Sequence, residues 1–193
     1  MAPSTLAFCE AHSAGACDAV YCTAPDGQIY LATCGADSKL CFRHDKDVGR
    51  VLASVGEAQG PLSALAMPPS GAFVVVADSE YVKMRSIPSG EEGSTLTRFV
   101  LPPRALAASP CGGLVAAGGD DEGVKLIALS SARVLRVLAA PAYTRGLAFD
   151  PEGAYVAVSS ADGTLSVWEA ASGRNMLTKK RACPRLEVGG GPE

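Results

Sequence analysis

Residues 147–169 read LAFDPEGAYVAVSSADGTLSVWE. Three short apolar runs, LAF, YVAV and TLSVW, are separated by two turn signals. The first turn is DPEG at residues 150–153, where proline presets φ at the second position and glycine suits the fourth, as in a type I turn. The second turn contains Asp162 and Gly163, which both tolerate positive φ and form a strong hairpin signal. The stretch therefore predicts a meander of three antiparallel strands.

The same turns recur along the chain at a fixed spacing. The tripeptide Pro-x-Gly begins at Pro25, Pro69, Pro110 and Pro151, at intervals of 41 to 44 residues. The hairpin aspartates Asp37, Asp78, Asp120 and Asp162 follow at intervals of 41 or 42 residues. Two independent landmarks with one period predict four copies of one unit, and a period of about 40–45 residues is typical of WD repeats. Trp168-Glu169 is a near match to the Trp-Asp pair of such repeats.

The composition of the strands predicts how the units pack. The runs after the opening turns are IYLATC, AFVVVA, LVAAGG and YVAVSS, which are mostly apolar at both parities. Such a strand is expected to be buried on both faces. We therefore predict an all-β fold, a β-propeller of the WD-repeat type, in which each unit forms one sheet, or blade, between its neighbours. Leu147, Phe149 and Trp168 are expected in the core, and the four aspartates and Gly163 in the blade turns.

The boundaries of the repeats predict the domain organisation. An N-terminal segment over residues 1–10 is expected to precede blades one to four over residues 11–178. Residues 174–179 are expected to form the last outer strand. The tail over residues 179–193 is basic and then glycine-rich, and it is expected to be disordered. Its start, Lys179-Lys180-Arg181, fits either a nuclear-localisation patch or a solvated chain end.

The units depart from the full repeat pattern in several places. Only the fourth unit ends in tryptophan, and Arg43, Arg85 and Ile127 occupy the equivalent positions of the others. A Gly-His pair at the start of a blade is missing, and Ala11-His12 is the nearest approach to it. The hydrogen-bonded Asp/His/Trp set of many WD blades is therefore expected to be incomplete in every unit.

Composition excludes several classes of protein. The 193 residues carry a net charge of −3, which offers no basic field for nucleic acid. No apolar run approaches the ~18 residues that a membrane span requires. The start of the chain lacks the basic and apolar regions of a secretory signal.

The sequence has seven cysteines and no C-x-x-C pair, so we expect buried free thiols in a reducing compartment. The cysteines are Cys9, Cys17, Cys22, Cys34, Cys41, Cys111 and Cys183.

Motifs for catalysis, cofactors and metals are also missing from the sequence. There is no G-x-S-x-G, no G-x-x-x-x-G-K-[ST] and no H-E-x-x-H. Gly112-Gly113 and Gly118-Gly119 flank a strand and open no helix, so they are not expected to bind phosphate. The acidic run of residues 120–122 is expected to form a hairpin turn and not a calcium-binding loop. An enzymatic propeller would need polar groups on the innermost runs LSALAM, RALAAS and RGLAFD, which offer none. We predict that the chain is not an enzyme and that it binds no cofactor, no metal and no small-molecule substrate.

Several segments resemble one family. They are IYLATCGADSKLCF at residues 29–42, Leu96-Thr97-Arg98-Phe99, LVAAGGDDEGVKLI at residues 114–127, and residues 147–169. The order and spacing of these segments, over roughly residues 11–173, are similar to the eukaryotic replisome adaptors known in animals as WD-repeat and HMG-box DNA-binding protein. The segment LTRF is the most telling, because it is expected in a connection between blades, where a general WD pattern requires no particular residue.

The resemblance implies a nuclear scaffold that links the replicative helicase to DNA polymerase alpha during DNA replication. It implies a first propeller of seven blades, of which this chain matches the first four, followed by a second, trimer-forming propeller that this chain lacks. Arg43 stands where the family usually has the tryptophan of the first blade. The expected partners are proteins of the replisome, and direct binding of DNA by this chain is not expected. The alternatives are a WD-repeat scaffold of another complex and a truncated, non-functional fragment.

Overall fold

The computed structural model describes residues 12–56, 60–121, 123–140 and 142–180. These residues form four antiparallel sheets of four strands each. The first sheet contains β1 (Ala16–Thr23), β2 (Ile29–Gly35), β3 (Lys39–His44) and β4 (Asp47–Gly56), and the second contains β5 (Ala64–Ala66), β6 (Phe73–Ala77), β7 (Tyr81–Ser86) and β8 (Glu92–Arg98). The third contains β9 (Pro103–Ala108), β10 (Leu114–Gly119), β11 (Val124–Ala128) and β12 (Arg133–Leu138), and the fourth β13 (Thr144–Phe149), β14 (Tyr155–Ser160), β15 (Leu165–Glu169) and β16 (Asn175–Lys179). No helix that could span a membrane occurs in these ranges.

Each sheet is a meander in which every strand pairs with the next one along the chain. In the fourth sheet, the turn over residues 150–153 closes through a hydrogen bond of 3.0 Å from the Gly153 N–H to the Asp150 carbonyl, with Gly153 at φ 73°. The next hairpin closes through a bond of 3.0 Å from the Gly163 N–H to the Ser160 carbonyl, with Gly163 at φ 80°. Both turns predicted from the sequence are therefore confirmed.

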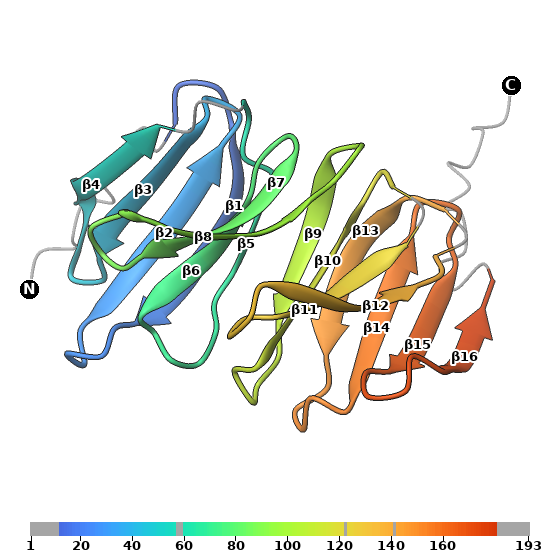
Figure 1. The fold of residues 1–193 in the computed structure, drawn as a ribbon. Coiled ribbons are helices and arrows are strands. Elements are labelled where there is room, and N and C mark those ends of the chain that lie inside the picture. The colour runs from blue at the N-terminus through green and yellow to red at the C-terminus, as the bar shows by residue number, and fades with distance from the viewer. Residues whose placement is uncertain (1–11, 57–59, 122, 141, 181–193) are drawn as a thin grey trace, which may run out of the picture.

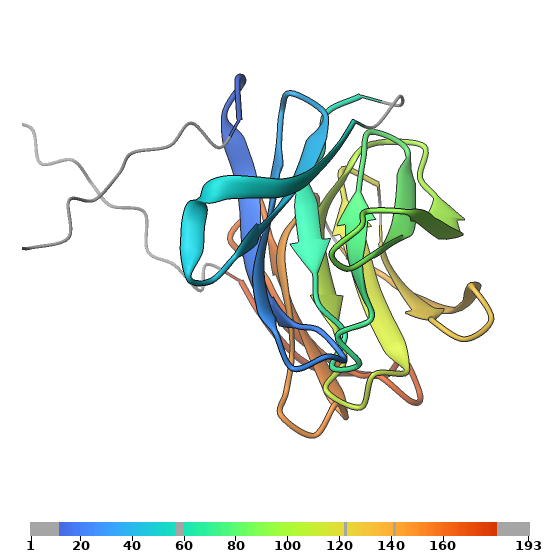
Figure 2. The ribbon, with the colours of Figure 1, turned by 90° about the vertical axis from the view of Figure 1, so that its left-hand side faces the viewer.

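The four sheets lie in a row in chain order, and the first and fourth sheets are at opposite ends of it (Figure 1). Seen from the side of the first sheet, they lie one behind another (Figure 2). The innermost strands β1, β5, β9 and β13 contact each other in that order. Each sheet thus packs face to face with its chain neighbours, as blades of a propeller do.

Three apolar clusters fill the spaces between successive sheets. The first cluster joins Leu40 and Phe42 of β3 to Val74 and Val76 of β6. The second joins Val75 and its neighbours to the third sheet, so β6 is buried on both faces. The third cluster joins the third and fourth sheets. The expectation of strands buried on both faces is therefore confirmed for the inner sheets.

The structure corrects one expectation about element boundaries, that of the segment LTRF. Leu96, Thr97 and Arg98 lie in β8, the outer strand of the second sheet, and only Phe99 follows it. The segment LTRF is therefore mostly strand, because its residues pair with β7 through Tyr81↔Arg98 and Val82↔Thr97. Strand β16 lies within residues 174–179, where the sequence predicted the last outer strand. Residues 1–10 and nearly all of the expected tail lie outside the described residues.

Candidate protein-interaction sites

A polar network on the first sheet connects residues that are far apart in the sequence. Nδ1 of His12 donates to Oδ1 of Asp37 at 2.8 Å, and Nε2 of His12 lies 3.0 Å from Oγ1 of Thr33. Nη1 of Arg43 donates to the same Thr33 oxygen at 3.1 Å. The two ring nitrogens of His12 therefore join the Asp37 carboxylate to the Thr33 hydroxyl. This set contains no tryptophan, so it is incomplete in the first unit as the sequence predicted, and Arg43 donates to Thr33 from the position of the tryptophan.

Asp37 is held as a carboxylate by this network. Burial alone would raise its pKa, but hydrogen bonds from His12 and from the N–H groups of Ser13 and Lys39 outweigh burial and lower the pKa to about 2. The side chain of Asp37 also caps the hairpin between β2 and β3, since it accepts the Lys39 N–H at 3.2 Å. Asp37 therefore stabilises the hairpin between β2 and β3.

The equivalent aspartates of the second and third sheets also lie in hairpins. Asp78 is buried, accepts the Tyr81 N–H at 2.6 Å and lies 2.9 Å from Nζ of Lys83. Asp120 lies between two arginines, at 3.1 Å from Nη2 of Arg104 and 3.8 Å from Nη1 of Arg145. Both carboxylates are engaged with cations of their own neighbourhood, so neither offers a bare acidic site.

The hairpin of the fourth sheet has the simplest contacts. Asp162 is exposed and accepts the Thr164 N–H at 2.9 Å. Hydrogen bonds from the Thr164 backbone and hydroxyl lower the pKa of Asp162. Gly163 next to it has φ 80°, the left-handed conformation that glycine adopts without strain. These two residues therefore shape a turn.

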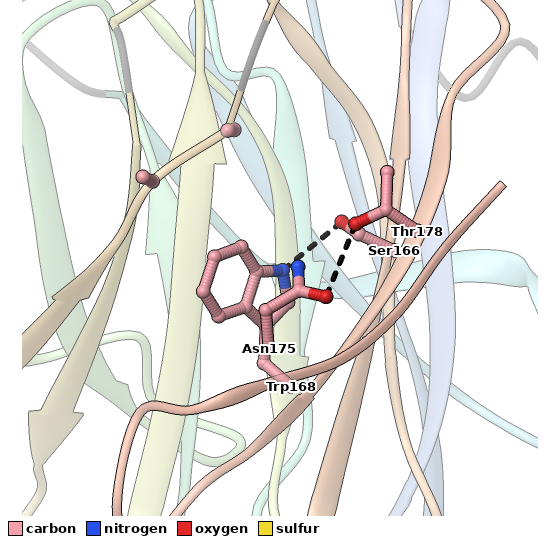
Figure 3. Close-up of a pocket in the computed structure, with 6 residues that line it drawn as sticks. Ser166, Trp168, Asn175 and Thr178 are labelled. Atoms are coloured by element: carbon pink, nitrogen blue, oxygen red, sulfur yellow. Dashed lines mark hydrogen bonds between the residues drawn. The ribbon is translucent and has the colours of Figure 1, made fainter. Parts of the chain in front are cut away.

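A groove of about 270 Å³ lies between the outer strands of the third and fourth sheets (Figure 3). Its lining residues are Ser166 and Trp168 of β15, Asn175 and Thr178 of β16, and Ala139 and Ala140 after β12. The indole Nε1 of Trp168 donates to Oγ of Ser166 at 3.0 Å. Oγ1 of Thr178 donates to Oδ1 of Asn175 at 3.1 Å. The indole is thereby fixed, and it presents an apolar wall opposite the alanine methyl groups.

The groove suits a short extended peptide better than a reactive small molecule. In the part of the chain that the structure describes, the side-chain amide nitrogen of Asn175 has no hydrogen-bond partner, so it is available to a peptide carbonyl. The indole and the alanines accept an aliphatic or prolyl side chain. At the nearby turn, Nε of Arg136 donates to the Ala171 carbonyl at 2.7 Å and ties β12 to the fourth sheet. Such an aromatic slot with one polar group is typical of peptide recognition.

The core residues predicted for the fourth sheet face the third sheet. Leu147, Phe149 and Trp168 are partly buried and pack against the third apolar cluster. Of the residues that match the family resemblance, Leu96 and Phe99 are buried. Arg98 is exposed, and its guanidinium forms an ion pair with the Glu80 carboxylate at 2.9 Å. The ring of Phe99 lies 3.8 Å from Nζ of Lys125, which joins the second sheet to the third.

A second hollow of about 320 Å³ lies among β1, the β2–β3 and β6–β7 hairpins and the start of β9. Its lining includes Cys17, Leu62, Asp78, Ser79 and Arg104. No group of three or more His, Cys, Asp or Glu side chains with metal-binding geometry occurs in the described ranges. The walls of the hollow are partly polar and partly apolar.

The cysteines fall into two classes. Cys22, Cys34 and Cys41 are buried and free, whereas Cys17 and Cys111 are free and exposed, so the expectation of buried thiols was wrong for these two. Burial raises the pKa of Cys22 to about 11 and that of Cys34 to about 12. The hydrogen bond with Ser109 lowers the pKa of Cys111. Cys9 and Cys183 lie outside the described residues.

Sequence reasoning missed Thr33, Asn175 and Thr178. Thr33 stands four residues before Asp37 on a strand whose other residues are apolar, and this polar outlier was a usable signal. No signal in the sequence marks Asn175 or Thr178, because the groove exists only where two sheets meet.

Comparisons with known proteins agree with this architecture. A family model described as WD domain, G-beta repeat matches residues 133–169, from the start of β12 to the end of β15. The chain is 28% identical to WD repeat and HMG-box DNA-binding protein 1 of Xenopus laevis over 149 residues, which is 75% of this chain and 13% of that protein. It is 27% identical to the Homo sapiens protein of the same name over 148 residues, with the same coverage.

A relative of another name is similar over a shorter stretch. The Periodic tryptophan protein 2 homolog of Schizosaccharomyces pombe is 32% identical over 115 residues, which is 58% of this chain and 14% of that protein. The chain therefore spans about 13–14% of the length of these relatives. The four meanders and the matched repeat together identify the fold as a β-propeller of the WD-repeat type.

Proposed function

We propose that this chain is a non-catalytic, protein-binding part of a nuclear replisome adaptor, which couples the replicative helicase to DNA polymerase alpha. The similarity to WD repeat and HMG-box DNA-binding proteins over 75% of the chain carries this proposal. The groove at Trp168 supports a role in protein binding, because it combines an apolar wall with an available amide. A WD-repeat scaffold of another complex is the second candidate, favoured by the 32% identity to the Periodic tryptophan protein 2 homolog.

Binding to purified replisome components tests the proposal. The immobilised 193-residue chain is presented with purified replicative helicase and, separately, with DNA polymerase alpha. We expect at least one of them to be retained by the wild-type chain. Retention should fall at least about tenfold for Asn175→Arg, which places a long charged side chain in the groove.

A matched variant controls for the added charge. Ser94→Arg introduces the same side chain on β8, an outer strand of another sheet, where the native residue is exposed. We expect it to leave retention unchanged. If the folded wild-type chain retains neither partner, the replisome proposal is wrong. If both variants lose retention equally, the groove is not the binding site.

A further inference from the structure

The groove at Trp168 has a filled counterpart between the second and third sheets. Trp168 on β15 occupies the same repeat position as Ile127 on β11, so Ser166 is equivalent to Lys125. The pairing of β10 with β11 and the pairing of β14 with β15 have the same register around these positions. The two interfaces between sheets can therefore be compared residue by residue.

Lys125 fills the space between the second and third sheets. Its Nζ donates to the Arg98 carbonyl at 2.6 Å and lies 3.8 Å from the centre of the Phe99 ring. Arg98 and Phe99 precede the first turn of the third sheet by the same number of residues as Ala139 and Ala140 precede that of the fourth. The two alanines are therefore the counterparts of the residues that hold the lysine.

The groove between the third and fourth sheets lacks the lysine of this contact. Ser166 stands in the place of the lysine and Ala140 in the place of the phenylalanine, and both line the groove. The aromatic ring comes instead from Trp168, at the position of Ile127. Figure 3 shows the Ser166 hydroxyl beside the indole nitrogen, to which it is hydrogen-bonded. The groove therefore has an aromatic wall and a backbone segment equivalent to that of Arg98, without a cation between them.

The second sheet also has a lysine at this repeat position. Lys83 is 8% exposed, and its Nζ lies 2.9 Å from a carboxylate oxygen of Asp78 and 5.3 Å from the centre of the Tyr81 ring. Two successive sheets thus place a lysine here, each with its ammonium near an aromatic ring. In the fourth sheet the serine leaves a space of about 270 Å³ at the same place.

The groove stays open if a further sheet packs against the fourth sheet. Its walls belong to the third and fourth sheets, at the end of β12 and on β15 and β16. Val156 and Val158 of β14 point into the cluster with the third sheet, so Tyr155 and Ala157 face the other way. A further sheet would cover that other face and not the groove.

We propose that the groove binds a lysine side chain of a partner polypeptide, with the ammonium on the Trp168 indole and near the Ala139 carbonyl. This inference rests on the protein-binding role proposed above and names the side chain that the groove accepts. The aliphatic stem of the lysine packs against the methyl groups of Ala139 and Ala140, while its charged end reaches polar groups. Tryptophan is the side chain that binds a cation most strongly through its ring face.

The amide of Asn175 indicates a polypeptide and not a free amine. Asn175 lies opposite Trp168 on the neighbouring strand. Its amide nitrogen has no hydrogen-bond partner among the described residues, and a peptide carbonyl next to the lysine can accept from it. A small amine would leave this donor in water. The net charge of −3 also favours a basic partner.

Titration with two matched peptides tests the proposal on the 193-residue chain. The probes are Ac-Ala-Ser-Lys-Ala-Ser-NH₂ and its norleucine counterpart, which retains an aliphatic stem but has no ammonium. Trp168 is the single tryptophan of the chain, so its fluorescence reports binding at the groove. We expect the lysine peptide to bind at least about tenfold more tightly, as a cation on an indole face allows. Equal affinity for the two peptides, or no saturable change of the emission with either, would overturn the proposal.

Variants at Ser166 show whether the lysine enters the groove. Ser166→Lys supplies a lysine from the chain itself, as Lys125 does in the third sheet, and should abolish binding of the lysine peptide. Ser94→Lys adds the same charge at an exposed position of β8 and should leave binding unchanged. If Ser166→Lys binds the peptide as well as the wild type does, the proposal is wrong. Ser166→Lys should also have a urea midpoint no lower than that of Ser166→Met, and a clearly lower midpoint would mean that the groove does not accept an ammonium.

Butylammonium distinguishes a free amine from a polypeptide. We expect it to displace the lysine peptide only at concentrations at least about tenfold higher than those of unlabelled peptide, because it makes no contact with the Asn175 amide. Displacement at equal concentration would mean that the site binds free amines, and the proposal would be wrong. A chain that binds the lysine peptide but retains neither helicase nor polymerase would refute only the replisome proposal. Retention of either protein with equal binding of the two peptides would refute only the lysine site.

Discussion

Trp168 is partly buried, whereas its counterparts Arg43, Arg85 and Ile127 are buried. It packs against the third apolar cluster, and its indole Nε1 is hydrogen-bonded to Ser166. Emptying a large aromatic site usually costs about 3–5 kcal/mol, and the lower end applies because this ring is only partly buried. We expect Trp168→Ala to reduce the free energy of unfolding by about 3 kcal/mol, measured by urea titration with circular dichroism. A loss under about 1 kcal/mol would contradict the observed packing.

Asp37 gives the molecule a defined response to acid. Its pKa in the folded chain is about 2, below the ordinary value of 3.8, so it binds its proton more readily when the chain unfolds. Its contribution to stability is therefore complete above pH ~4 and is lost as the pH falls towards ~2. We expect the difference in urea midpoint between wild type and Asp37→Asn to shrink over this pH interval. A constant difference from pH ~6 to ~2 would show that the carboxylate charge is not involved.

The sequence revealed single residues only where a landmark repeats. Asp37 and Trp168 were recognised because they fall on the repeat period. His12 and Thr33 were not assembled with them, because their hydrogen bonds depend on the pairing of β2 with β3 and on a segment that precedes the first strand. The substitution of an indole donor by Arg43 could not be predicted, since it depends on the distance to the Thr33 hydroxyl.

At the scale of elements, the turns between strands also hold adjacent sheets in place. Gly71 has φ 65°, and a Cβ at this position would collide with the Thr23 carbonyl of the first sheet. Gly27 has φ 79°, and nothing lies near its Cβ position. We expect Gly27→Ala to cost about 1–2 kcal/mol for backbone strain alone, and Gly71→Ala to cost at least about 1 kcal/mol more, measured by urea titration. Equal losses of unfolding free energy for the two variants would mean that the turn at Gly71 does not pack against the first sheet.

The strand pattern was predicted better than the connections between strands. Turn residues and apolar runs located all four meanders, because hairpins are specified locally. The segment LTRF was expected in a connection, yet Leu96 to Arg98 belong to β8. Outer strands alternate weakly and are mostly exposed, so composition does not distinguish them from loops. The groove at Trp168 was not predictable, because it forms only where the segment after β12 approaches β15 and β16.

At the scale of the whole molecule, charge predicts weak contact with nucleic acid. The net charge is −3, and several arginines are already paired with carboxylates, such as Arg98 with Glu80 and Arg104 with Asp120. Binding to DNA requires several unpaired cations on one face. We expect no duplex binding tighter than about 1 μM at ~150 mM salt in an anisotropy titration. Sub-micromolar binding would contradict this expectation and show that the chain has a basic surface that binds DNA.

The fourth sheet has an apolar face that is equivalent to the face by which the first sheet packs against the second sheet. Tyr30, Ala32 and Leu40 are buried at that contact, being 6%, 0% and 0% exposed. Tyr155, Ala157 and Leu165 occupy the equivalent positions of the fourth sheet, and Tyr155 is 38% exposed. A face of four strands with about five residues each covers roughly 300 Å². This is below the ~800 Å² per partner of a stable interface, so we expect association that is weak and dependent on concentration.

Sedimentation velocity of the 193-residue chain tests most directly whether these sheets are built to pack against further sheets. We expect the weight-average sedimentation coefficient of the wild type to rise between about 2 and 200 μM, as mass action requires. Leu165→Lys should suppress this rise, because it places a charge on the uncovered face of the fourth sheet. Lys46→Leu, at an exposed position outside that face, serves as the control and should not suppress it. A wild-type chain that stays monomeric over this range, with a cooperative melt above about 60 °C, would contradict the account and show that four sheets are sufficient by themselves.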